Sequence, residues 1–316
     1  MDKNVPHISV VIPVYLAENC LNELYYRLKK SLEIITLDFE IIFIEDCGGD
    51  NSWNVIYELA QKDSRVIGFR LSRNFGQHYA TTAGLDLCKG DWVVFMDCDL
   101  QDHPEEINSL YKKAQEGYDV VLAKRENRED PFFKKICSVL FYVVLNYLAD
   151  SKLDPRVANF RIISRKAADS IKQMRESLRF ISCLNDWVGF KTTSINVKHS
   201  KAYNRKSAYN FKKLLSLAKD VIIAYSDKPL KMSVNMGFFI SFIAIIFGFY
   251  YIFRKIKYGI PILGWASLIV IILFLGGIVI ANLGIIGIYL GKTFEETKKR
   301  PLYIIAEKTD FKKSEV

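Results

Sequence analysis

Residues 92–102 read WVVFMDCDLQD, a short apolar run followed by three acids. The run Trp92–Met96 does not alternate between apolar and polar residues, which is typical of a strand buried on both faces. Ligands of open α/β sheets bind beyond the carboxyl ends of the strands, so Asp97 and Asp99 lie at a candidate ligand site. These acids are one residue apart, so on an extended backbone both carboxylates project to the same side.

Four similar apolar runs lie nearby in the chain, and stretches of helical length separate them. The runs are Ile8–Tyr15, Phe39–Glu45, Val66–Leu71 and Asp119–Ala123. The stretches of helical length are Asn19–Glu33, Ser52–Gln61, Gln77–Cys88 and Pro104–Glu116. This alternation of strands and helices predicts an α/β fold with a doubly wound, mostly parallel sheet.

Two neighbouring carboxylates at a buried strand end repel each other unless a cation binds between them. Mg²⁺ commonly takes one or two carboxylates and completes its shell with phosphate oxygens of a substrate. We therefore predict that Asp97 and Asp99 hold a divalent cation, Mg²⁺ or Mn²⁺. The alternative is a solvated loop with two acids, because an Asp-x-Asp pattern also occurs by chance.

A second acidic cluster, EDCGGDNS at residues 45–52, ends the run Phe39–Glu45. Because it lies at the same sheet edge, Asp46 is expected to contact a nucleotide, although a purely structural role stays open. The first run ends in Pro13-Val14-Tyr15, with no Gly-x-Gly-x-x-Gly after it, and the chain has no complete P-loop motif. Dinucleotide oxidoreductases and P-loop nucleotidases are therefore poor fits.

Charge is distributed unevenly along the chain. Residues 1–200 contain 26 Lys and Arg against 28 Asp and Glu, whereas residues 201–316 contain 18 against 7. The first part lacks the basic surface of a nucleic-acid-binding protein, so we expect no nucleic-acid partner. The six cysteines form no Cys-x-x-Cys pair and are expected to be free thiols in a reducing compartment.

The basic C-terminal part also contains two long uncharged stretches, Met232–Phe253 and Tyr258–Gly291. Each is long enough to cross a bilayer, at roughly 20 residues per span, and Trp265–Leu290 is the expected second span. Basic residues are more numerous on the outer flanks than in the loop Arg254–Gly264, which predicts that both termini lie in the cytoplasm. The N-terminus lacks a basic region followed by an apolar stretch, so no signal peptide is expected.

These features predict four segments in a multi-pass protein of the cytoplasmic membrane. Residues 1–204 are expected to form a cytosolic α/β domain, and residues 205–230 an amphipathic juxtamembrane segment. Residues 231–292 are expected to form two transmembrane helices, at about 232–253 and 265–290, and residues 293–316 a cytosolic tail. Two shorter apolar segments, Ile136–Ala149 and Phe211–Tyr225, are expected to be either core helices or interfacial helices.

Eight short motifs, in their order and spacing, resemble those of family 2 glycosyltransferases with the GT-A fold. They are Val11-Ile12-Pro13-Val14-Tyr15, Glu45-Asp46 through Asp50, Arg73-Asn74-Phe75-Gly76, Asp97-Cys98-Asp99-Leu100-Gln101-Asp102, Leu122-Ala123-Lys124-Arg125, Asn159-Phe160-Arg161, Ser207-Ala208-Tyr209 and Lys299-Arg300-Pro301-Leu302-Tyr303. The resemblance covers nearly the whole chain. Within the family, the chain most resembles the polyisoprenyl-phosphate glycosyltransferases. This group includes bactoprenol glucosyltransferases, undecaprenyl-phosphate aminoarabinose transferase and dolichol-phosphate mannose synthase.

The resemblance implies a role for each matched residue. Pro13, Tyr15 and Asp46 would line the base and ribose site. Asp97 would contact the nucleotide, Asp99 would ligate the metal and Gln101 would lie near the sugar; these three form the expected catalytic group. The candidates for phosphate and acceptor binding are Arg125, Arg128, Asn159, Arg161, Arg205, Lys206 and Ser207. Arginine suits this role because its guanidinium makes bidentate bonds to phosphate.

The chain departs from the family pattern at three places. Leu16-Ala17 replace the usual Asn-Glu, and Asn159 replaces an Asp that has been proposed as a base in relatives. In the block Ala202–Tyr209 two cations are lost and Arg205 stands where glycine is expected, so we expect Arg205 and Lys206 to supply the phosphate clamp. The departures therefore concentrate on the acceptor side.

The resemblance implies a metal-dependent, inverting transfer of a sugar from a nucleotide-sugar to a polyisoprenyl phosphate at a lipid bilayer. The expected donor is a uridine-diphosphate sugar, although the sequence does not settle the base, and the expected purpose is synthesis or modification of a cell-surface glycan. The identity of the sugar and self-association into a homo-oligomer are left open. A processive polysaccharide synthase is a poor fit, because the chain contains no Gln-x-x-Arg-Trp block. A catalytically weak or dead membrane scaffold remains the alternative from a different class.

Overall fold

The computed structural model describes residues 6–125, 143, 146–148, 154, 156–198, 222–223, 226–258 and 264–309. The chain divides into two compact units. Unit 1 comprises Met1–Asn146, Ser151–Leu214 and Arg300–Val316, and unit 2 comprises Tyr147–Asp150 and Leu215–Lys299. The last part of the chain thus belongs to the same unit as the first part.

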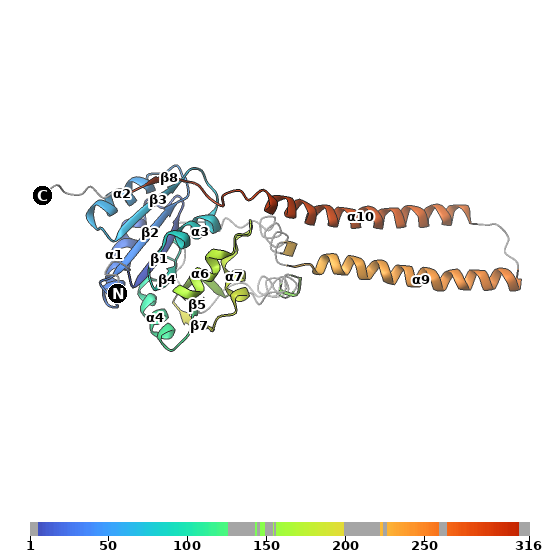
Figure 1. Ribbon diagram of the computed structural model, residues 1–316, viewed down its shortest axis with the longest axis horizontal. Coiled ribbons are helices and arrows are strands. Elements are labelled where there is room, and N and C mark those ends of the chain that lie inside the picture. The colour runs from blue at the N-terminus through green and yellow to red at the C-terminus, as the bar shows by residue number, and fades with distance from the viewer. Residues whose placement is uncertain are drawn as a thin grey trace. The chain divides into compact units, whose positions relative to one another are not determined.

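Unit 1 is built on a sheet whose described strands follow the order β7-β5-β6-β4-β1-β2-β3-β8 (Figure 1). The strands are β1 Ile8–Val14, β2 Phe39–Glu45, β3 Val66–Leu71, β4 Trp92–Phe95, β5 Val120–Arg125, β6 Val157–Ser164, β7 Thr192–Val197 and β8 Ile305–Lys308. The central strands β4, β1, β2 and β3 are parallel. Strand β6 is antiparallel to both β4 and β5, and β8 is antiparallel to β3.

Helices pack against both faces of this sheet. They are α1 Leu21–Glu33, α2 Ser52–Lys62, α3 Gln77–Leu87, the 3₁₀ turn η1 Pro104–Glu106, α4 Ile107–Gln115, α6 Arg165–Gln173 and α7 Ile181–Val188. Helices α1, α2 and α4 lie on one face, whereas α3 and α6 pack on strands β1, β2, β4 and β6 from the other face. The prediction of an α/β fold with a mostly parallel, doubly wound sheet is confirmed.

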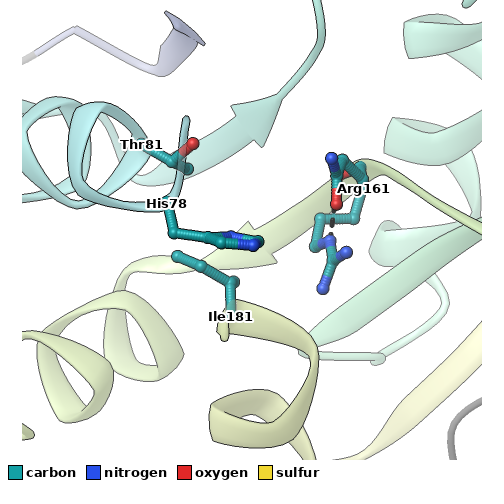
Figure 2. A pocket seen from close by; sticks show the side chains of 5 residues that line it. His78, Thr81, Arg161 and Ile181 are labelled. Atoms are coloured by element: carbon teal, nitrogen blue, oxygen red, sulfur yellow. Dashed lines mark hydrogen bonds between the residues drawn. The ribbon is translucent and has the colours of Figure 1, made fainter. Parts of the chain in front are cut away.

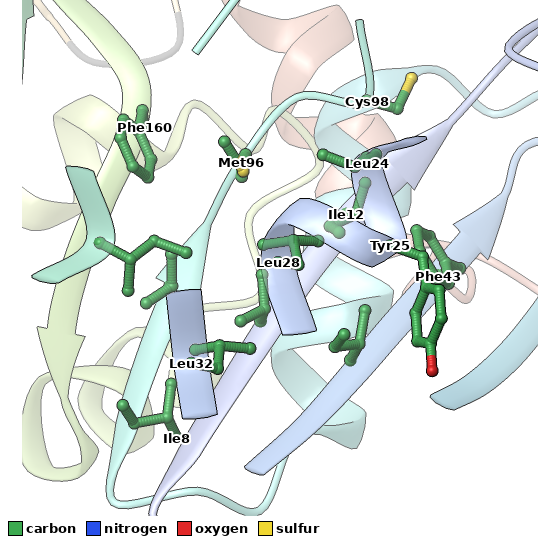
Figure 3. Close-up of a cluster of buried hydrophobic side chains, with 14 of the residues drawn as sticks. Ile8, Ile12, Leu24, Tyr25, Leu28, Leu32, Phe43, Met96, Cys98 and Phe160 are labelled. Carbon is green, nitrogen blue, oxygen red and sulfur yellow. The ribbon is translucent and has the colours of Figure 1, made fainter. Parts of the chain in front are cut away.

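The main core lies between β1 and α1 (Figure 3). Alternate residues of β1, among them Ile8 and Ile12, point to this face. Leu24, Leu28 and Leu32 of α1 cover them at helical spacing. All five side chains are fully buried. Burial of each of these side chains contributes about 1.5–3 kcal/mol to stability. This face therefore holds β1 in place, with Pro13 near its end and Tyr15 directly after it.

On the opposite face α3 approaches β1 so closely that only glycine fits. A Cβ atom added at Gly84 would lie 2.2 Å from Val11 Cγ1. The helix that follows β3 is therefore held directly on the centre of the sheet. Its first turn, Gln77 and His78, lies at the carboxyl edge of the strands as a result.

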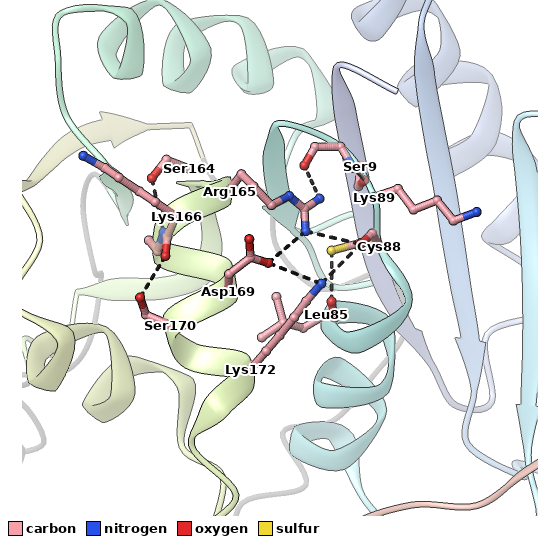
Figure 4. Close-up of polar contacts among 12 residues, drawn as sticks. Ser9, Leu85, Cys88, Lys89, Ser164, Arg165, Lys166, Asp169, Ser170 and Lys172 are labelled. Carbon is pink, nitrogen blue, oxygen red and sulfur yellow. Dashed lines mark hydrogen bonds and ion pairs between the residues drawn. The ribbon is translucent and has the colours of Figure 1, made fainter. Parts of the chain in front are cut away.

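Helix α6 is fixed to the turn between α3 and β4 by polar contacts (Figure 4). Arg165 donates to the carbonyl oxygens of Cys88 and Gly90, and Lys172 Nζ donates to Cys88 O at 3.3 Å. The backbone N–H of Gly90 donates to Ser9 Oγ at 2.7 Å. These contacts connect α6 to the amino ends of β1 and β4, at the sheet edge away from Asp97.

The C-terminal segment differs from the expected tail. Strand β8 pairs with β3 so that Arg70 lies opposite Glu307, and Arg70 Nη1 donates to Glu307 Oε1 at 3.0 Å. Thr309 is buried, and its Oγ1 accepts from Gly68 N at 2.9 Å. Tyr303 Oη donates to Asp86 Oδ2 of α3 at 2.9 Å. An exposed edge strand has unpaired backbone groups, and residues 304–309 form hydrogen bonds with those of β3. Sequence periodicity does not reveal this pairing, because the segment is too short.

Unit 2 contains two long apolar helices, α9 Lys228–Tyr258 and α10 Trp265–Thr297, which contact each other. Both expected spans lie within them. Within the described residues, two stretches are long and apolar enough to cross a membrane, Lys228–Arg254 and Ile271–Thr297, with mean hydropathy 2.2 and 2.6. Tyr289 Oη donates to Ser226 O at 2.8 Å, which ties the start of α9 to α10. The short apolar segments Ile136–Ala149 and Phe211–Tyr225 fall almost wholly outside the described residues.

We predict that Thr309→Val lowers the melting temperature of the full-length protein. The substitution keeps the shape of the side chain but leaves the buried Gly68 N–H without an acceptor, which costs about 1–3 kcal/mol. Each kcal/mol corresponds to roughly 2–4 °C for a domain of this size. Thermal unfolding followed by tryptophan fluorescence measures the change. Lys308→Gln, at the exposed neighbouring position, is the control, and equal melting temperatures for the two variants would contradict the role of Thr309.

Candidate active site

The parallel register of β1, β2 and β4 brings their carboxyl ends to one edge of the sheet. Val14 lies opposite Glu45, and Val11 lies opposite Phe95. Strand β6 runs the other way, so its first residues lie at the same edge, with Arg161 opposite Phe95. This edge therefore gathers the predicted residues of five strands: Pro13, Tyr15, Asp46, Asp97, Asp99, Gln101, Arg125, Asn159 and Arg161.

Asp97 lies at the centre of the cluster, directly beyond β4. Gln77 Nε2 donates to its Oδ1 at 2.6 Å, and the side chain of Asn159 makes a second hydrogen bond to the same carboxylate. Burial among protein atoms, followed by the negative charges of Asp102 and Asp99, raises the pKa of Asp97 to about 7. Arg125 acts in the opposite direction. The Asp97 carboxylate is thus held in place but is destabilised in its charged form.

The surroundings of Asp97 fit a divalent cation. No group of three or more His, Cys, Asp and Glu side chains with the geometry of a metal site occurs among the described residues. A complete protein cage is unnecessary, however, when substrate phosphates supply the remaining oxygens. Burial and then the charges of Asp102 and Asp99 raise the pKa of Asp97, and a cation between Asp97 and Asp99 would offset this destabilisation of the carboxylate. Gln101 N–H donates to Asp99 Oδ1 at 3.2 Å, which orients the Asp99 carboxylate.

Asp46 is 2% exposed and organises the loop that follows β3. Its Oδ1 accepts from Phe75 N at 2.7 Å and its Oδ2 from Gly76 N at 2.8 Å. Burial raises the pKa of Asp46, and these two backbone hydrogen bonds act against that rise. The structural role considered for Asp46 is therefore present, and its contact with a nucleotide stays a prediction. Pro13 is buried nearby, whereas Tyr15 is exposed beside it.

Two arginines of the site differ in their surroundings. Arg161 is fully buried, and its guanidinium donates to Asn159 O at 2.9 Å and to Ser182 Oγ of α7 at 3.1 Å. Burial lowers the pKa of Arg161 to about 10, while Asp97 partly offsets this effect. Arg125 is partly exposed, and its Nε has no hydrogen-bond partner in the described part of the chain. Arg128, Arg205, Lys206 and Ser207 lie outside the described residues.

Strained backbone conformations cluster in the loops of this edge. Leu16, Cys47 and Leu100 have φ values of 52°, 52° and 60°, in the left-handed region. They follow the ends of β1, β2 and β4, respectively. Such residues cost on the order of 1–3 kcal/mol each and persist only where the surrounding structure holds them. The strain is typical of a functional site and agrees with the carboxylate cluster.

Sequence reasoning missed three residues near this edge: Gln77, which bonds to Asp97, and His78 and Ile181, which line a small pocket together with Asn159 and Arg161. A signal existed for the first two, because a helix that follows a parallel strand begins at the carboxyl edge. Ile181 gave no such signal, since α7 follows an irregular stretch, residues 174–180. Its position depends on Arg179, which is fully buried and donates to Thr82 Oγ1 of α3 at 3.3 Å.

We predict that Asp46→Asn lowers the melting temperature by several degrees in the absence of any ligand. Asparagine presents an NH₂ group to one of the two backbone N–H donors, so one buried hydrogen bond is lost at a cost of about 1–3 kcal/mol. Thermal unfolding in detergent measures the shift. The same substitution at exposed Asp38 serves as control, and a melting temperature for Asp46→Asn equal to that of the control would refute the loop-organising role.

Comparison with known proteins agrees with this geometry. The model of Glycosyl transferase family 2 matches residues 9–171. A prophage bactoprenol glucosyl transferase homolog of Escherichia coli K12 is 37% identical over 94% of this chain and 98% of its own length. A glycosyltransferase of Bacillus subtilis is 38% identical over 94% of this chain and 92% of its own length. A bactoprenol glucosyl transferase of Shigella phage SfV is 36% identical over 94% and 97%, respectively.

Among solved structures, glucosyl-3-phosphoglycerate synthase from Mycobacterium tuberculosis, in complex with Mn²⁺, uridine diphosphate and phosphoglyceric acid, has a similar fold. The TM-score is 0.51 at 17% identity, over 69% of this chain and 77% of the other. This likeness shows that unit 1 has the GT-A fold. Because the family match runs from β1 to α6 and the relatives match over more than nine tenths of both chains, the protein belongs to glycosyltransferase family 2.

Proposed function

We propose that this glycosyltransferase moves a hexose from a uridine-diphosphate sugar to undecaprenyl phosphate or a similar polyisoprenyl phosphate. The reaction takes place at the cytoplasmic face of the membrane and serves the synthesis or modification of a cell-surface glycan. The observation that carries the proposal is the Asp97 carboxylate cluster, in a chain that continues into two long apolar helices. The relatives named bactoprenol glucosyl transferases support the acceptor, and the uridine diphosphate bound by the mycobacterial synthase supports the donor.

The chemistry at the donor is a displacement at the anomeric carbon. Asp99, with Asp97 beside it, would hold Mg²⁺ or Mn²⁺, which when bound stabilises the departing diphosphate. A phosphate oxygen of the acceptor attacks the anomeric carbon while the bond to the diphosphate breaks, so uridine diphosphate leaves. One displacement inverts the anomeric configuration.

The acceptor phosphate needs little help from a base. The second pKa of a phosphate monoester is about 6, so near pH 7 most of the nucleophile is already a dianion. Positioning and charge neutralisation are then the main tasks of the protein. Asn159, which cannot act as a base, fits this demand, because its amide bonds to Asp97 instead. Arg125 faces the same site with an unused Nε donor in the described part of the chain, which supports its proposed contact with a phosphate.

The path of the chain supports the proposed membrane topology. Unit 2 begins and ends at residues that continue into unit 1, since residues 300–316 belong to the unit that also contains Met1–Asn146. Two spans between these points keep both ends on one side of a bilayer. Large apolar side chains of α9 and α10, such as Phe239 and Phe274, are exposed by more than 60%, and lipid would cover them. This agrees with the excess of Lys and Arg on the outer flanks.

We predict that the full-length protein with Mg²⁺ converts labelled uridine-diphosphate hexose and undecaprenyl phosphate into a chloroform-soluble product. Asp99→Ala is expected to lower the rate by about 10²-fold or more, because the leaving diphosphate loses its charge stabilisation. Chelation with EDTA should stop the reaction, and Mg²⁺ or Mn²⁺ should restore it. Product counts over time measure each rate.

The matched control for this assay is Asp91→Ala, at the opposite end of β4, which should leave the rate within about twofold. If no nucleotide-sugar in a panel gives a lipid product, the proposal is wrong and a scaffold role gains weight. Retention of the anomeric configuration in the product, read from its proton coupling, would rule out a single displacement.

A reporter fusion tests the membrane topology. We expect alkaline phosphatase, which is active only outside the cytosol, to be active when fused after Gly259 and inactive when fused after Lys298. The reason is that the first fusion point follows one span and the second follows two. Comparable activity at both points, after correction for expression, would contradict a hairpin with both ends in the cytosol.

A further inference from the structure

A small pocket is lined in part by Asn159, whose side chain bonds to Asp97 (Figure 2). Its walls are His78 and Thr81 of α3, Asn159 and Arg161 of β6, and Ile181 of α7. The free space is about 20 Å³, which is enough for one group of about the size of a water molecule. The pocket therefore suits one substituent of a ligand and is too small for a whole sugar ring.

One wall of the pocket, Asn159, and the residue next to another wall are bonded to the carboxylate of the proposed donor site. Gln77, the neighbour of His78, donates to Asp97 Oδ1 at 2.6 Å, and the Asn159 side chain also bonds to Asp97. In a nucleotide-sugar the hexose is joined directly to the diphosphate. A donor whose diphosphate is bound at Asp97 and Asp99 therefore presents its sugar next to this pocket.

The lining matches a hydroxyl group. His78 is neutral, because burial and then the charge of Arg161 lower its pKa to about 4, so its ring offers one N–H donor and one acceptor. The Thr81 hydroxyl already donates to Gln77 O at 2.8 Å and can still accept, Asn159 can donate and accept, and Arg161 only donates. A hydroxyl does both, whereas a phosphate or carboxylate only accepts and would also face the charge of Asp97. An acetamido group exceeds the available space.

The pocket is held rigid by contacts behind its walls. The His78 ring meets the Phe180 ring edge-on, with centroids 5.1 Å apart. Arg179, the residue before Phe180, donates to Ile171 O at 3.2 Å and to Met174 O at the end of α6, as well as to Thr82 of α3. One buried guanidinium thus joins α3, α6 and the start of α7. A rigid polar pocket discriminates strongly, because a missing hydroxyl leaves its groups unpaired.

We propose that this pocket recognises one hydroxyl of the donor sugar through His78 and thereby selects a neutral hexose over its deoxygenated and N-acetylated counterparts. The inference rests on the proposed function, since it assumes a nucleotide-sugar at Asp97. Beyond the proposed function, it identifies His78 as the residue that determines sugar specificity and a neutral hexose as the sugar that is accepted.

The test measures binding without any lipid acceptor. Calorimetry with the full-length protein and Mg²⁺ gives the affinities of uridine diphosphate, uridine-diphosphate glucose and galactose, and the four monodeoxy forms of the tighter-binding hexose donor. In the wild type, removal of one particular hydroxyl should weaken binding about tenfold or more. In His78→Phe, which keeps the ring contact with Phe180, that difference should fall below threefold, with the affinity for uridine diphosphate kept within twofold.

The matched control is His7→Phe. The His7 ring also meets an aromatic ring edge-on, that of Tyr111 at 5.6 Å, but it lies at the amino end of β1. This variant should keep the full discrimination. The inference is overturned if the wild type shows no discrimination of threefold or more, if a hexose adds nothing to the affinity of uridine diphosphate, or if His78→Phe still discriminates by threefold or more.

A second variant decides the matter if His78→Phe does not fold. Ile181→Ala enlarges the pocket, so binding of uridine-diphosphate N-acetylglucosamine relative to the hexose donor should rise at least threefold. An unchanged ratio would overturn the inference, and misfolding cannot mimic such a gain.

Because no acceptor is present, a protein that makes no glycolipid can still show the discrimination. If the protein transfers sugar to lipid but does not distinguish the deoxy donors from the hexose donor, the proposed function stands and only the inference about the pocket fails.

Discussion

The pairing of β4 between β1 and β6 is the constraint on which the site depends. Strand β4 is short, Trp92–Phe95, and is parallel to β1 but antiparallel to β6. The carboxyl end of β4 lies next to the first residues of β6, because the two strands run in opposite directions. The Asn159 side chain therefore meets the Asp97 carboxylate. The same register places Arg161 under the site. The pairing of β4 with β6 therefore fixes the positions of the Asp97 carboxylate and of the polar residues Asn159 and Arg161 next to it.

The electrostatics around Asp97 are unfavourable to its charged form. Burial has the largest effect, the negative charges of Asp102 and Asp99 add to it, and Arg125 opposes it. Left-handed residues in three adjacent loops add backbone strain at the same sheet edge. The buried core beneath β1 supplies the stability that tolerates them.

The two long apolar helices are followed in the chain by residues 300–316, which belong to unit 1. Strand β8, beyond α10, completes the sheet edge, and Tyr303 reaches Asp86 on the helix that begins with Gln77 and His78. Arg70 connects Glu307 to Glu45, the neighbour of Asp46. During synthesis the sheet therefore remains incomplete until both apolar helices have been made. The candidate site is thus linked to the chain on either side of the helix pair.

The sequence by itself determined the alternation of strands and helices, the carboxyl edge as the site, and the acids Asp97, Asp99 and Asp46. It could do so because local hydrophobic periodicity fixes elements and parallel topology fixes where strands end. Only the tertiary structure decided that β6 and β8 join the sheet antiparallel, that Asp46 holds a loop, that Gln77 bonds to Asp97, and that His78 and Ile181 line one pocket. These contacts join residues far apart in the chain, for example 241 positions for Gly68 and Thr309, and no local pattern encodes such pairings.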